Sequence, residues 1–196
     1  MKLRGLYAIT PDGPGLTDRV RAALEGGAVM LQYRSKRAAN LDEAKKLARL
    51  ARHYAVPFIV NDDVELALEI DADGAHLGRE DGDLRSARKK LSGKVLGASC
   101  YNDIGRARAA VRAGADYLAF GSVFPSATKP GAVRAPLSIF AEARALGVPL
   151  AAIGGITLGN AHQVIAAGAD MVAVISDLFD ASDIAARARD YGRLFA

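Results

Sequence analysis

The sequence predicts a single-domain (β/α)8 TIM barrel with short loops over residues 1–196, and three observations support this fold class. Short apolar runs recur along the chain, each bounded by Gly or Pro and followed by an Ala-, Leu- and Arg-rich stretch with apolar residues three and four positions apart. Eight such runs start about 24 residues apart on average, close to the length of one βα unit. The runs are almost continuously apolar, as expected for parallel strands covered on both faces. Because 196 residues is near the lower limit for this fold, the loops must be short.

The first four expected strands lie in the N-terminal half of the chain. The run 3–9 (LRGLYAI) ends before a Thr-Pro pair, and the run 29–34 (VMLQYR) follows the joint Glu-Gly-Gly-Ala. The run 57–61 (PFIVN) begins at a proline, and the run 74–77 (GAHL) includes the end of the joint Asp-Ala-Asp-Gly-Ala. We interpret a glycine in each joint as the left-handed residue at which the preceding helix ends.

The last four expected strands are the runs 95–99 (VLGAS), 117–121 (YLAFG), 149–153 (PLAAI) and 171–176 (MVAVIS). The second and fourth of these follow identical Ala-Gly-Ala-Asp joints, which repeats the helix-ending pattern. An open, doubly wound sheet is the alternative topology. No G-x-G-x-x-G motif follows the first strand, so the commonest signature of a dinucleotide-binding sheet is missing. We expect one domain without a linker.

The composition argues against several classes of function. The chain is 51% hydrophobic and 24% charged, and no apolar stretch reaches the roughly 18 residues of a membrane span. A single cysteine, Cys100, cannot form an intrachain disulfide, and the N-terminus carries no signal pattern, so we expect a cytoplasmic protein. The net charge of +4 comes from scattered basic residues and Trp is absent, so we expect no nucleic-acid partner. A homo-oligomer is compatible with these features.

Candidate site residues stand where the predicted strands end, because the active site of such a barrel lies at the C-terminal ends of its strands. The residues at or beside these strand ends are Gln32, Tyr33, Arg34, Ser35, Lys36, Asn61, Asp62, Asp81, Ser99, Gly154, Gly155, Ile175 and Ser176, and the loop after the sixth strand adds Ser126, Ala127, Thr128 and Lys129.

Two carboxylates follow adjacent strands. Asp62 and Asp81 offer hard oxygen ligands that suit one octahedral magnesium ion retaining several waters. The alternative is that Asp62 or Asp63 caps the helix starting at Val64, and that Asp81 caps the helix from Leu84 onward. Nearby cationic residues favour a magnesium-bound pyrophosphate over the capping role. These residues are Arg34, Lys36 and Lys129.

A second group predicts a phosphate site. Gly154-Gly155 and Ile175-Ser176 follow strands seven and eight, whose loops are the recurrent phosphate cradle of such barrels. The alternatives are a tight turn for the glycines and a helix cap for Ser176. The Thr128-Lys129 segment could close over the same region.

Two other reactive residue types are interpreted as structural. His76 lies inside a predicted strand, so we expect a buried, hydrogen-bonded histidine, and we expect Cys100 to be a small buried hydrophobe. No H-E-x-x-H or G-x-S-x-G motif is present, which argues against a zinc protease and a serine hydrolase.

The strand-end motifs together resemble the thiamine-phosphate synthase family. The resemblance runs from LYAIT at 6–10 to the Ile-Ser pair at 175–176, and its motifs are LQYRSK at 31–36, VNDD at 60–63, DGAHLGRED at 73–81, the loop 120–129 and AIGGI at 152–156. It implies a transferase (EC 2.5.1.3) that joins 4-amino-5-hydroxymethyl-2-methylpyrimidine diphosphate to 4-methyl-5-(2-phosphooxyethyl)thiazole. The products are thiamine phosphate and pyrophosphate. The resemblance also implies a magnesium cofactor and small phosphorylated substrates as partners.

The resemblance assigns roles to the strand-end residues. It implies catalytic roles for Arg34, Lys36 and Lys129, and magnesium binding by Asp62 and Asp81. Residues expected to bind the pyrimidine diphosphate are Gln32, Tyr33, Arg34, Ser35, Lys36, Asn61, Ser99 and Lys129. Those expected to bind the thiazole phosphate are Ser126, Ala127, Thr128, Gly154, Gly155, Ile175 and Ser176. The implied mechanism is dissociative, with pyrophosphate leaving before the thiazole nitrogen attacks.

The chain departs from the family pattern at two positions in the loop after the sixth strand, and two other functions are compatible with the fold. Ser122 and Ser126 stand where the family commonly has proline and threonine; Ser126 keeps the hydroxyl, whereas Ser122 leaves the loop conformation open. The alternatives are a thiazole tautomerase on the same fold, which lacks the full pyrophosphate-binding set, and a non-catalytic phosphate-ligand sensor. The complete set of cations and carboxylates in this chain favours the synthase.

Overall fold

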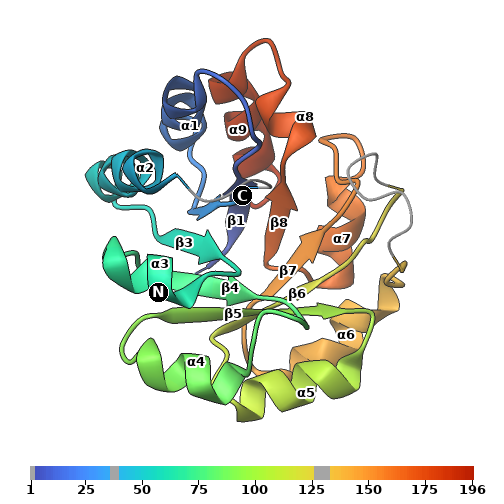
Figure 1. The fold of residues 1–196 in the computed structure, drawn as a ribbon. Coiled ribbons are helices and arrows are strands. Elements are labelled where there is room, and N and C mark those ends of the chain that lie inside the picture. Colours follow the sequence, from blue (N-terminus) through green and yellow to red (C-terminus); the bar gives the residue numbers. More distant parts are fainter. Residues whose placement is uncertain (1–2, 36–39, 126–132) are drawn as a thin grey trace.

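The computed structural model describes residues 3–35, 40–125 and 133–196 (Figure 1). Within these residues, eight parallel strands pair in chain order and close into a barrel when β8 pairs with β1. The strands are β1 (Gly5–Ile9), β2 (Met30–Tyr33), β3 (Phe58–Asn61), β4 (Gly74–Leu77), β5 (Val95–Tyr101), β6 (Tyr117–Phe120), β7 (Leu150–Ile153) and β8 (Met171–Val174). The predicted (β/α)8 barrel is therefore confirmed, and strand boundaries differ from the prediction by at most two residues.

Helices surround the barrel, as Figure 1 shows. They are α1 (Leu16–Glu25), α2 (Leu41–His53), α3 (Val64–Glu69), α4 (Leu84–Lys90), α5 (Ile104–Arg112), α6 (Ser138–Ala143), the short 3-10 helix η1 (Arg144–Leu146), α7 (Ala161–Ala167), α8 (Ser176–Phe179) and α9 (Ile184–Arg193). Side-chain caps help to define where five of these helices begin. A side-chain oxygen accepts a hydrogen bond from the backbone N–H three residues on at Asn40, Asp63, Asp83, Asp103 and Asp183.

The strands separate two apolar cores, because alternate residues of a strand point to opposite faces. The larger core lies between the outer faces of the strands and the helices. The smaller core fills the barrel interior. Its fully or nearly fully buried residues are Leu3, Tyr7, Ile9, Met30, Ile59, Tyr117, Ala119, Ala151, Met171 and Ala173. Within the described residues, no helix is both long and apolar enough to cross a membrane.

The predicted role of the joint glycines holds at three joints and is wrong at the fourth. Gly27, Gly114 and Gly168 have φ angles of 93°, 95° and 113°, as expected for residues that end helices. At the joint 71–75 the left-handed residue is Asp71, with φ 50°. Gly74 instead begins β4, where an added Cβ would lie 1.9 Å from the carbonyl oxygen of Val95, so this glycine permits close strand packing.

Cys100 is fully buried, and its burial raises the pKa of the thiol to about 12, which confirms its structural interpretation. We expect the folded protein to be inert to a disulfide-exchange reagent at neutral pH, because both access and thiolate formation are suppressed. The rate of labelling should rise in urea along the unfolding curve followed by circular dichroism. Rapid stoichiometric labelling in native buffer would contradict this assignment.

Candidate active site at the barrel mouth

A cavity of about 780 Å³ opens at the C-terminal ends of the strands. The structure brings many of the predicted site residues together around it, although they come from six different strand ends. The predicted residues that line the cavity are Gln32, Arg34, Asn61, Asp62, Asp81, Ser99, Gly154, Gly155, Ile175 and Ser176. Lys36, Ser126, Ala127, Thr128 and Lys129 lie outside the described residues. Ser35 follows Arg34 but is not among the residues that line the cavity.

Tyr33 corrects one prediction, because its side chain faces the helices rather than the cavity. The side chain is buried and stacks on Phe58, with ring centroids 6.4 Å apart. Its hydroxyl accepts a hydrogen bond from the Asn40 backbone N–H at 3.1 Å. Gln32 points into the barrel, so strand alternation turns the next residue outward. The Tyr33 side chain is therefore not part of the cavity lining.

Asp62 and Asp81 form a carboxyl pair in the cavity. The two carboxyl groups lie close enough for the charge of one to act on the other. Partial desolvation and then the Asp81 carboxyl raise the pKa of Asp62 to about 6, while Arg34 opposes the rise. Asp81 also accepts a hydrogen bond from the Gly78 backbone N–H at 2.7 Å. The pair is thus held by its own strand-end loops.

The alternative capping role is wrong for both members of this pair. Asp63 caps α3 by accepting from Leu66 N at 2.9 Å, and Asp83 caps α4 by accepting from Ser86 N at 2.8 Å. Asp62 has a left-handed φ of 64°, which lies outside helical and extended geometry. The local reason is that the capping residue of each helix lies one or two residues after the carboxylate that enters the cavity, so that the helices begin at Val64 and Leu84.

The carboxyl pair fits a magnesium ion. Two neighbouring carboxylates whose charges repel each other are stabilised when a divalent cation binds to both. Within the described residues, no group of three or more His, Cys, Asp or Glu side chains could hold a metal. Two protein carboxylates, completed by waters and phosphate oxygens, are typical of magnesium sites. The donor set therefore matches magnesium better than zinc.

Arg79 and Tyr101 also line the cavity, although neither was predicted as a site residue. The Arg79 guanidinium lies 5.1 Å from the centroid of the Tyr101 ring, and both residues line the cavity. Arg106 lies 5.8 Å from the same ring and donates to Ser99 O and Gly78 O. β5 runs two residues past its predicted end, and its register shifts between Ser99 and Tyr101. No local sequence signal marks that shift.

The glycine pair after β7 forms a tight cradle opposite the carboxyl pair. Gly154 and Gly155 have φ angles of 101° and 64°. A Cβ on Gly155 would lie 2.2 Å from Pro125 O, and one on Gly154 would lie 2.2 Å from the Ser122 hydroxyl. Ser122 is buried and donates its hydroxyl to Phe124 O at 2.7 Å. The loop after β6 therefore packs directly on these glycines, with Ser122 supporting its turn.

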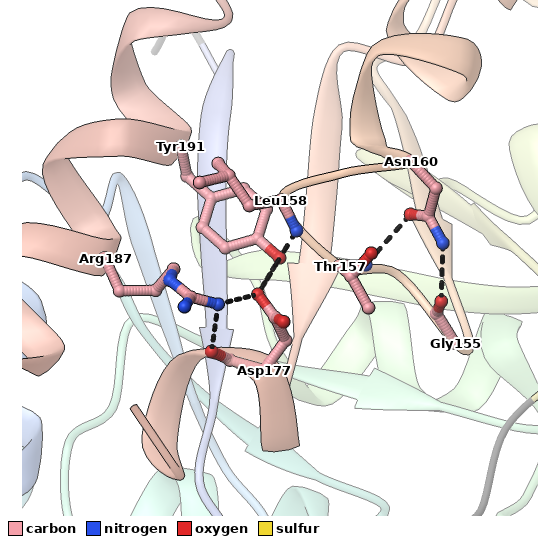
Figure 2. A network of polar contacts seen from close by, with 7 residues as sticks. All are labelled: Gly155, Thr157, Leu158, Asn160, Asp177, Arg187 and Tyr191. Carbon is pink, nitrogen blue, oxygen red and sulfur yellow. Dashed lines mark hydrogen bonds and ion pairs between the residues drawn. The ribbon is translucent and has the colours of Figure 1, made fainter. Parts of the chain in front are cut away.

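Figure 2 shows the hydrogen bonds that hold the loop between β7 and α7, which forms one side of this cradle. Asn160 accepts from Thr157 N at 2.9 Å and donates to Gly155 O at 3.0 Å. These two bonds close the loop between β7 and α7 around one amide side chain. The backbone oxygen of Gly155 is therefore oriented toward Asn160, and the residue is held at its left-handed geometry.

Asp177 fastens the other side of the cradle (Figure 2). Its carboxylate accepts from Leu158 N at 3.2 Å, from Arg187 Nη1 at 2.7 Å and from the Tyr191 hydroxyl at 2.7 Å. The residue before it, Ser176, begins α8 and makes no side-chain cap, so the capping alternative for Ser176 is wrong. Asp177 thereby links the loops after β7 and β8 to α9.

His76 has the buried, hydrogen-bonded setting that the sequence predicts. Its Nδ1 lies 2.9 Å from the Tyr117 hydroxyl, and its Nε2 lies 2.9 Å from the Ser99 hydroxyl. Burial lowers the pKa of His76 to about 4, against a smaller opposing effect of Asp81. The imidazole is therefore neutral at physiological pH.

Comparisons with known proteins agree on one family. A sequence profile described as thiamine monophosphate synthase matches residues 6–178. The thiamine-phosphate synthase of Aromatoleum aromaticum is 60% identical over 202 residues, with 99% of this chain and 97% of the relative covered. That of Chromobacterium violaceum is 56% identical over 195 residues, with 96% and 94% covered. The solved thiamine phosphate pyrophosphorylase from Pyrococcus furiosus superposes with a TM-score of 0.89 at 36% identity, over 99% of this chain and 96% of that one.

Proposed function

The chain belongs to the thiamine monophosphate synthase family, and we propose that its barrel-mouth cavity joins the pyrimidine diphosphate to the thiazole phosphate by a dissociative, magnesium-assisted substitution. The observation that carries this mechanism is the placement of two sites around one cavity. The carboxyl pair Asp62 and Asp81, with Arg34, stands on one side, and the Gly154-Gly155 cradle stands on the other. This arrangement provides separate places for a leaving pyrophosphate and for a phosphorylated nucleophile.

The pyrophosphate side uses cations and carboxylates. Asp62 and Asp81 would hold magnesium, which would supply positive charge to offset the charge that develops on the departing oxygens. Arg34 lines the same part of the cavity and binds those oxygens directly. Lys36 and Lys129 are assigned the same role from the sequence alone, since they lie outside the described residues.

In the bond-forming step, the residues of the cavity act by holding the two substrates in position. The C–O bond between the pyrimidine methylene and the diphosphate breaks with its electron pair leaving on oxygen, and the thiazole nitrogen lone pair then forms the new C–N bond. Gln32, Asn61 and Ser99 hold the pyrimidine, while Gly155 and the Ile175-Ser176 backbone hold the thiazole phosphate. Ser126, Ala127 and Thr128 complete the phosphate site in this proposal. No side-chain nucleophile is needed.

The proposal extends to the cellular setting. We propose a cytoplasmic enzyme whose partners are its two small phosphorylated substrates. The absence of a nucleic-acid partner and the compatibility with a homo-oligomer stay predictions from the sequence, and size-exclusion chromatography with light scattering addresses the second.

A mixing assay tests the reaction. Purified protein is combined with both substrates, with and without magnesium, and pyrophosphate and thiamine phosphate are quantified together. We expect equal amounts of both products and no turnover without the metal. Isomerisation of a thiazole carboxylate phosphate without coupling would instead support the tautomerase, and binding of both ligands by folded protein without any product would support a sensor.

We expect Asp177→Asn to raise KM for the thiazole phosphate roughly tenfold while leaving KM for the pyrimidine diphosphate unchanged, because the neutral amide weakens the charged bond to Arg187 that fastens the cradle. Steady-state kinetics with each substrate varied in turn measures both constants. The matched control is Asp183→Asn, because asparagine caps α9 as well as aspartate does. An equal rise in both KM values would show a general structural defect rather than a positioning role.

A further inference from the structure

Five polar side chains form a continuous hydrogen-bonded chain across the barrel interior. Gln32 Nε2 donates to the Tyr7 hydroxyl at 2.6 Å, and that hydroxyl lies 2.7 Å from the hydroxyl of Tyr117. Tyr117 continues to His76 Nδ1 at 2.9 Å, and His76 Nε2 reaches the Ser99 hydroxyl at 2.9 Å. Both ends of the chain line the cavity, whereas Tyr117 is fully buried beneath it.

The donors in such a chain must all point the same way. Each tyrosine hydroxyl has one proton, and with Gln32 Nε2 as the donor to Tyr7, the order that uses every hydroxyl proton has Tyr7 donating to Tyr117. In this order Tyr117 donates to His76 Nδ1, which is then the unprotonated ring nitrogen. In the same order the neutral imidazole carries its proton on Nε2 and donates it to the Ser99 hydroxyl oxygen, 2.9 Å away. The Ser99 hydroxyl proton is therefore not used within the chain.

The surroundings keep this chain uncharged. Burial raises the pKa of both Tyr7 and Tyr117 and lowers the pKa of His76, so no member ionises at neutral pH. Within the described residues, no buried side-chain nitrogen or oxygen lacks a partner. The polarity is thus set by the order of neutral donors and acceptors.

Gly97 makes room for the centre of the chain. A Cβ at this position would lie 2.4 Å from both the Tyr117 hydroxyl and His76 Nδ1, the two atoms that form the central bond. Every other residue type would displace one of them. The absence of a side chain in the middle of β5 is therefore part of the arrangement.

We propose that Tyr7, Tyr117 and His76 are positioning residues whose one-way hydrogen-bonded chain commits the Ser99 hydroxyl to donate into the cavity. The consequence for substrate choice rests on the proposed function. A Ser99 hydroxyl that donates into the cavity favours the 4-aminopyrimidine ring, because a ring nitrogen of that substrate is unprotonated and accepts the hydrogen bond. The 4-oxo analogue of the ring carries a proton on the nitrogen beside the carbonyl and presents a second donor there. A donor facing a donor leaves both unpaired in a buried site, which disfavours the analogue.

The tautomer of His76 tests the polarity directly. In nitrogen-15 NMR spectra of the ligand-free, uniformly labelled protein at neutral pH, His76 is expected to show an unprotonated Nδ1 and a protonated Nε2. The His76→Gln variant identifies its signals among the three histidines. A protonated Nδ1 would mean that the chain runs from Ser99 to Gln32, and it would overturn the proposal.

Substrate discrimination tests the consequence. For the parent enzyme, kcat/KM for the 4-amino pyrimidine diphosphate should exceed that for the 4-oxo analogue by a factor on the order of 10². Tyr117→Phe removes the donor to His76 and should reduce this ratio at least tenfold, with KM for the thiazole phosphate unchanged. Tyr7→Phe breaks the chain one link earlier and serves if Tyr117→Phe does not fold.

Tyr54→Phe is the matched control, because it removes a bonded tyrosine hydroxyl, 3.0 Å from Glu25, on the outside of the barrel. It should leave the discrimination ratio at the parent value. An unchanged ratio in both chain variants would overturn the selection. The NMR result does not depend on turnover, so a failed mixing assay with the expected tautomer would reject the proposed reaction and keep the polarity.

Discussion

Asp62→Asn is expected to lower kcat/KM by a factor on the order of 10² or more while leaving the metal-free protein at least as stable as the parent. The loss of activity follows because the amide removes one of the two anionic oxygen ligands for magnesium, and 10² corresponds to about 2.7 kcal/mol of transition-state stabilisation. The retained fold follows from geometry. Asn has the size of Asp and tolerates the left-handed φ of 64° at this position.

The stability expectation has its own electrostatic reason. Partial desolvation and then Asp81 raise the pKa of Asp62 to about 6, so above that pH its charge opposes the metal-free folded state. The neutral amide removes this charge. Thermal unfolding in the presence of a chelator at pH 7.5 should therefore give a Tm equal to or above that of the parent. A variant that is less active but no less stable is typical of a functional site.

The neighbouring carboxylate provides the control for this experiment. Asp63→Asn changes the same functional group one residue later, where the side chain caps α3, and asparagine caps comparably well. Its pyrophosphate release across a magnesium titration should stay within about twofold of the parent. If Asp62→Asn follows the parent curve over the whole titration, Asp62 is not a magnesium ligand.

Gly155→Ala is expected to destabilise the fold by about 2–4 kcal/mol and to raise KM for the thiazole phosphate more than tenfold. The left-handed φ of 64° disfavours alanine, and its Cβ would lie 2.2 Å from Pro125 O and 2.8 Å from Phe124 O. The loop after β6 must then move away from the cradle. Urea unfolding and thiazole phosphate titration measure the two effects.

Gly147→Ala is the control that separates the cost of backbone strain from the cost of a close contact made by the added Cβ. Gly147 also has a left-handed φ, 73°, but a Cβ there would have no atom within 4 Å. This variant should lose only about 1 kcal/mol and keep the parent KM for the thiazole phosphate. Equal losses of stability in both variants, with neither KM changed, would show that the packing of the loop on Gly155 does not shape the phosphate site.

The sequence by itself determined the barrel and the position of its active end. Strand and helix signals are local, because apolar periodicity, glycine joints and strand-end polar residues are each read within a few neighbouring positions. Because strands that alternate with helices run parallel, the C-terminal ends of all the strands lie at one mouth of the barrel. For this reason, residues as far apart as Gln32 and Ser176 could be predicted to share one site, and both line the same cavity.

Adjacent residues with the same chemistry could not be told apart from the sequence. Asp62 enters the cavity and Asp63 caps a helix because their backbone angles differ, and nothing in the run VNDD records that difference. Tyr33 was predicted to bind the pyrimidine diphosphate, but its side chain lies on the outer face, between two residues that line the cavity, Gln32 and Arg34. Strand alternation from Gln32 to Arg34 does turn Tyr33 outward, so this orientation could be predicted from the sequence.

Only the tertiary structure decided which distant side chains meet. The register shift in β5 brings Tyr101 to the cavity beside Arg79, and closure of β8 on β1 completes the ring. Inside that ring, Tyr7 and Tyr117 come within 2.7 Å although 110 residues separate them. Such contacts depend on the register and curvature of the whole barrel, which result from the packing of all eight units together. For this reason no single segment of the sequence predicts them.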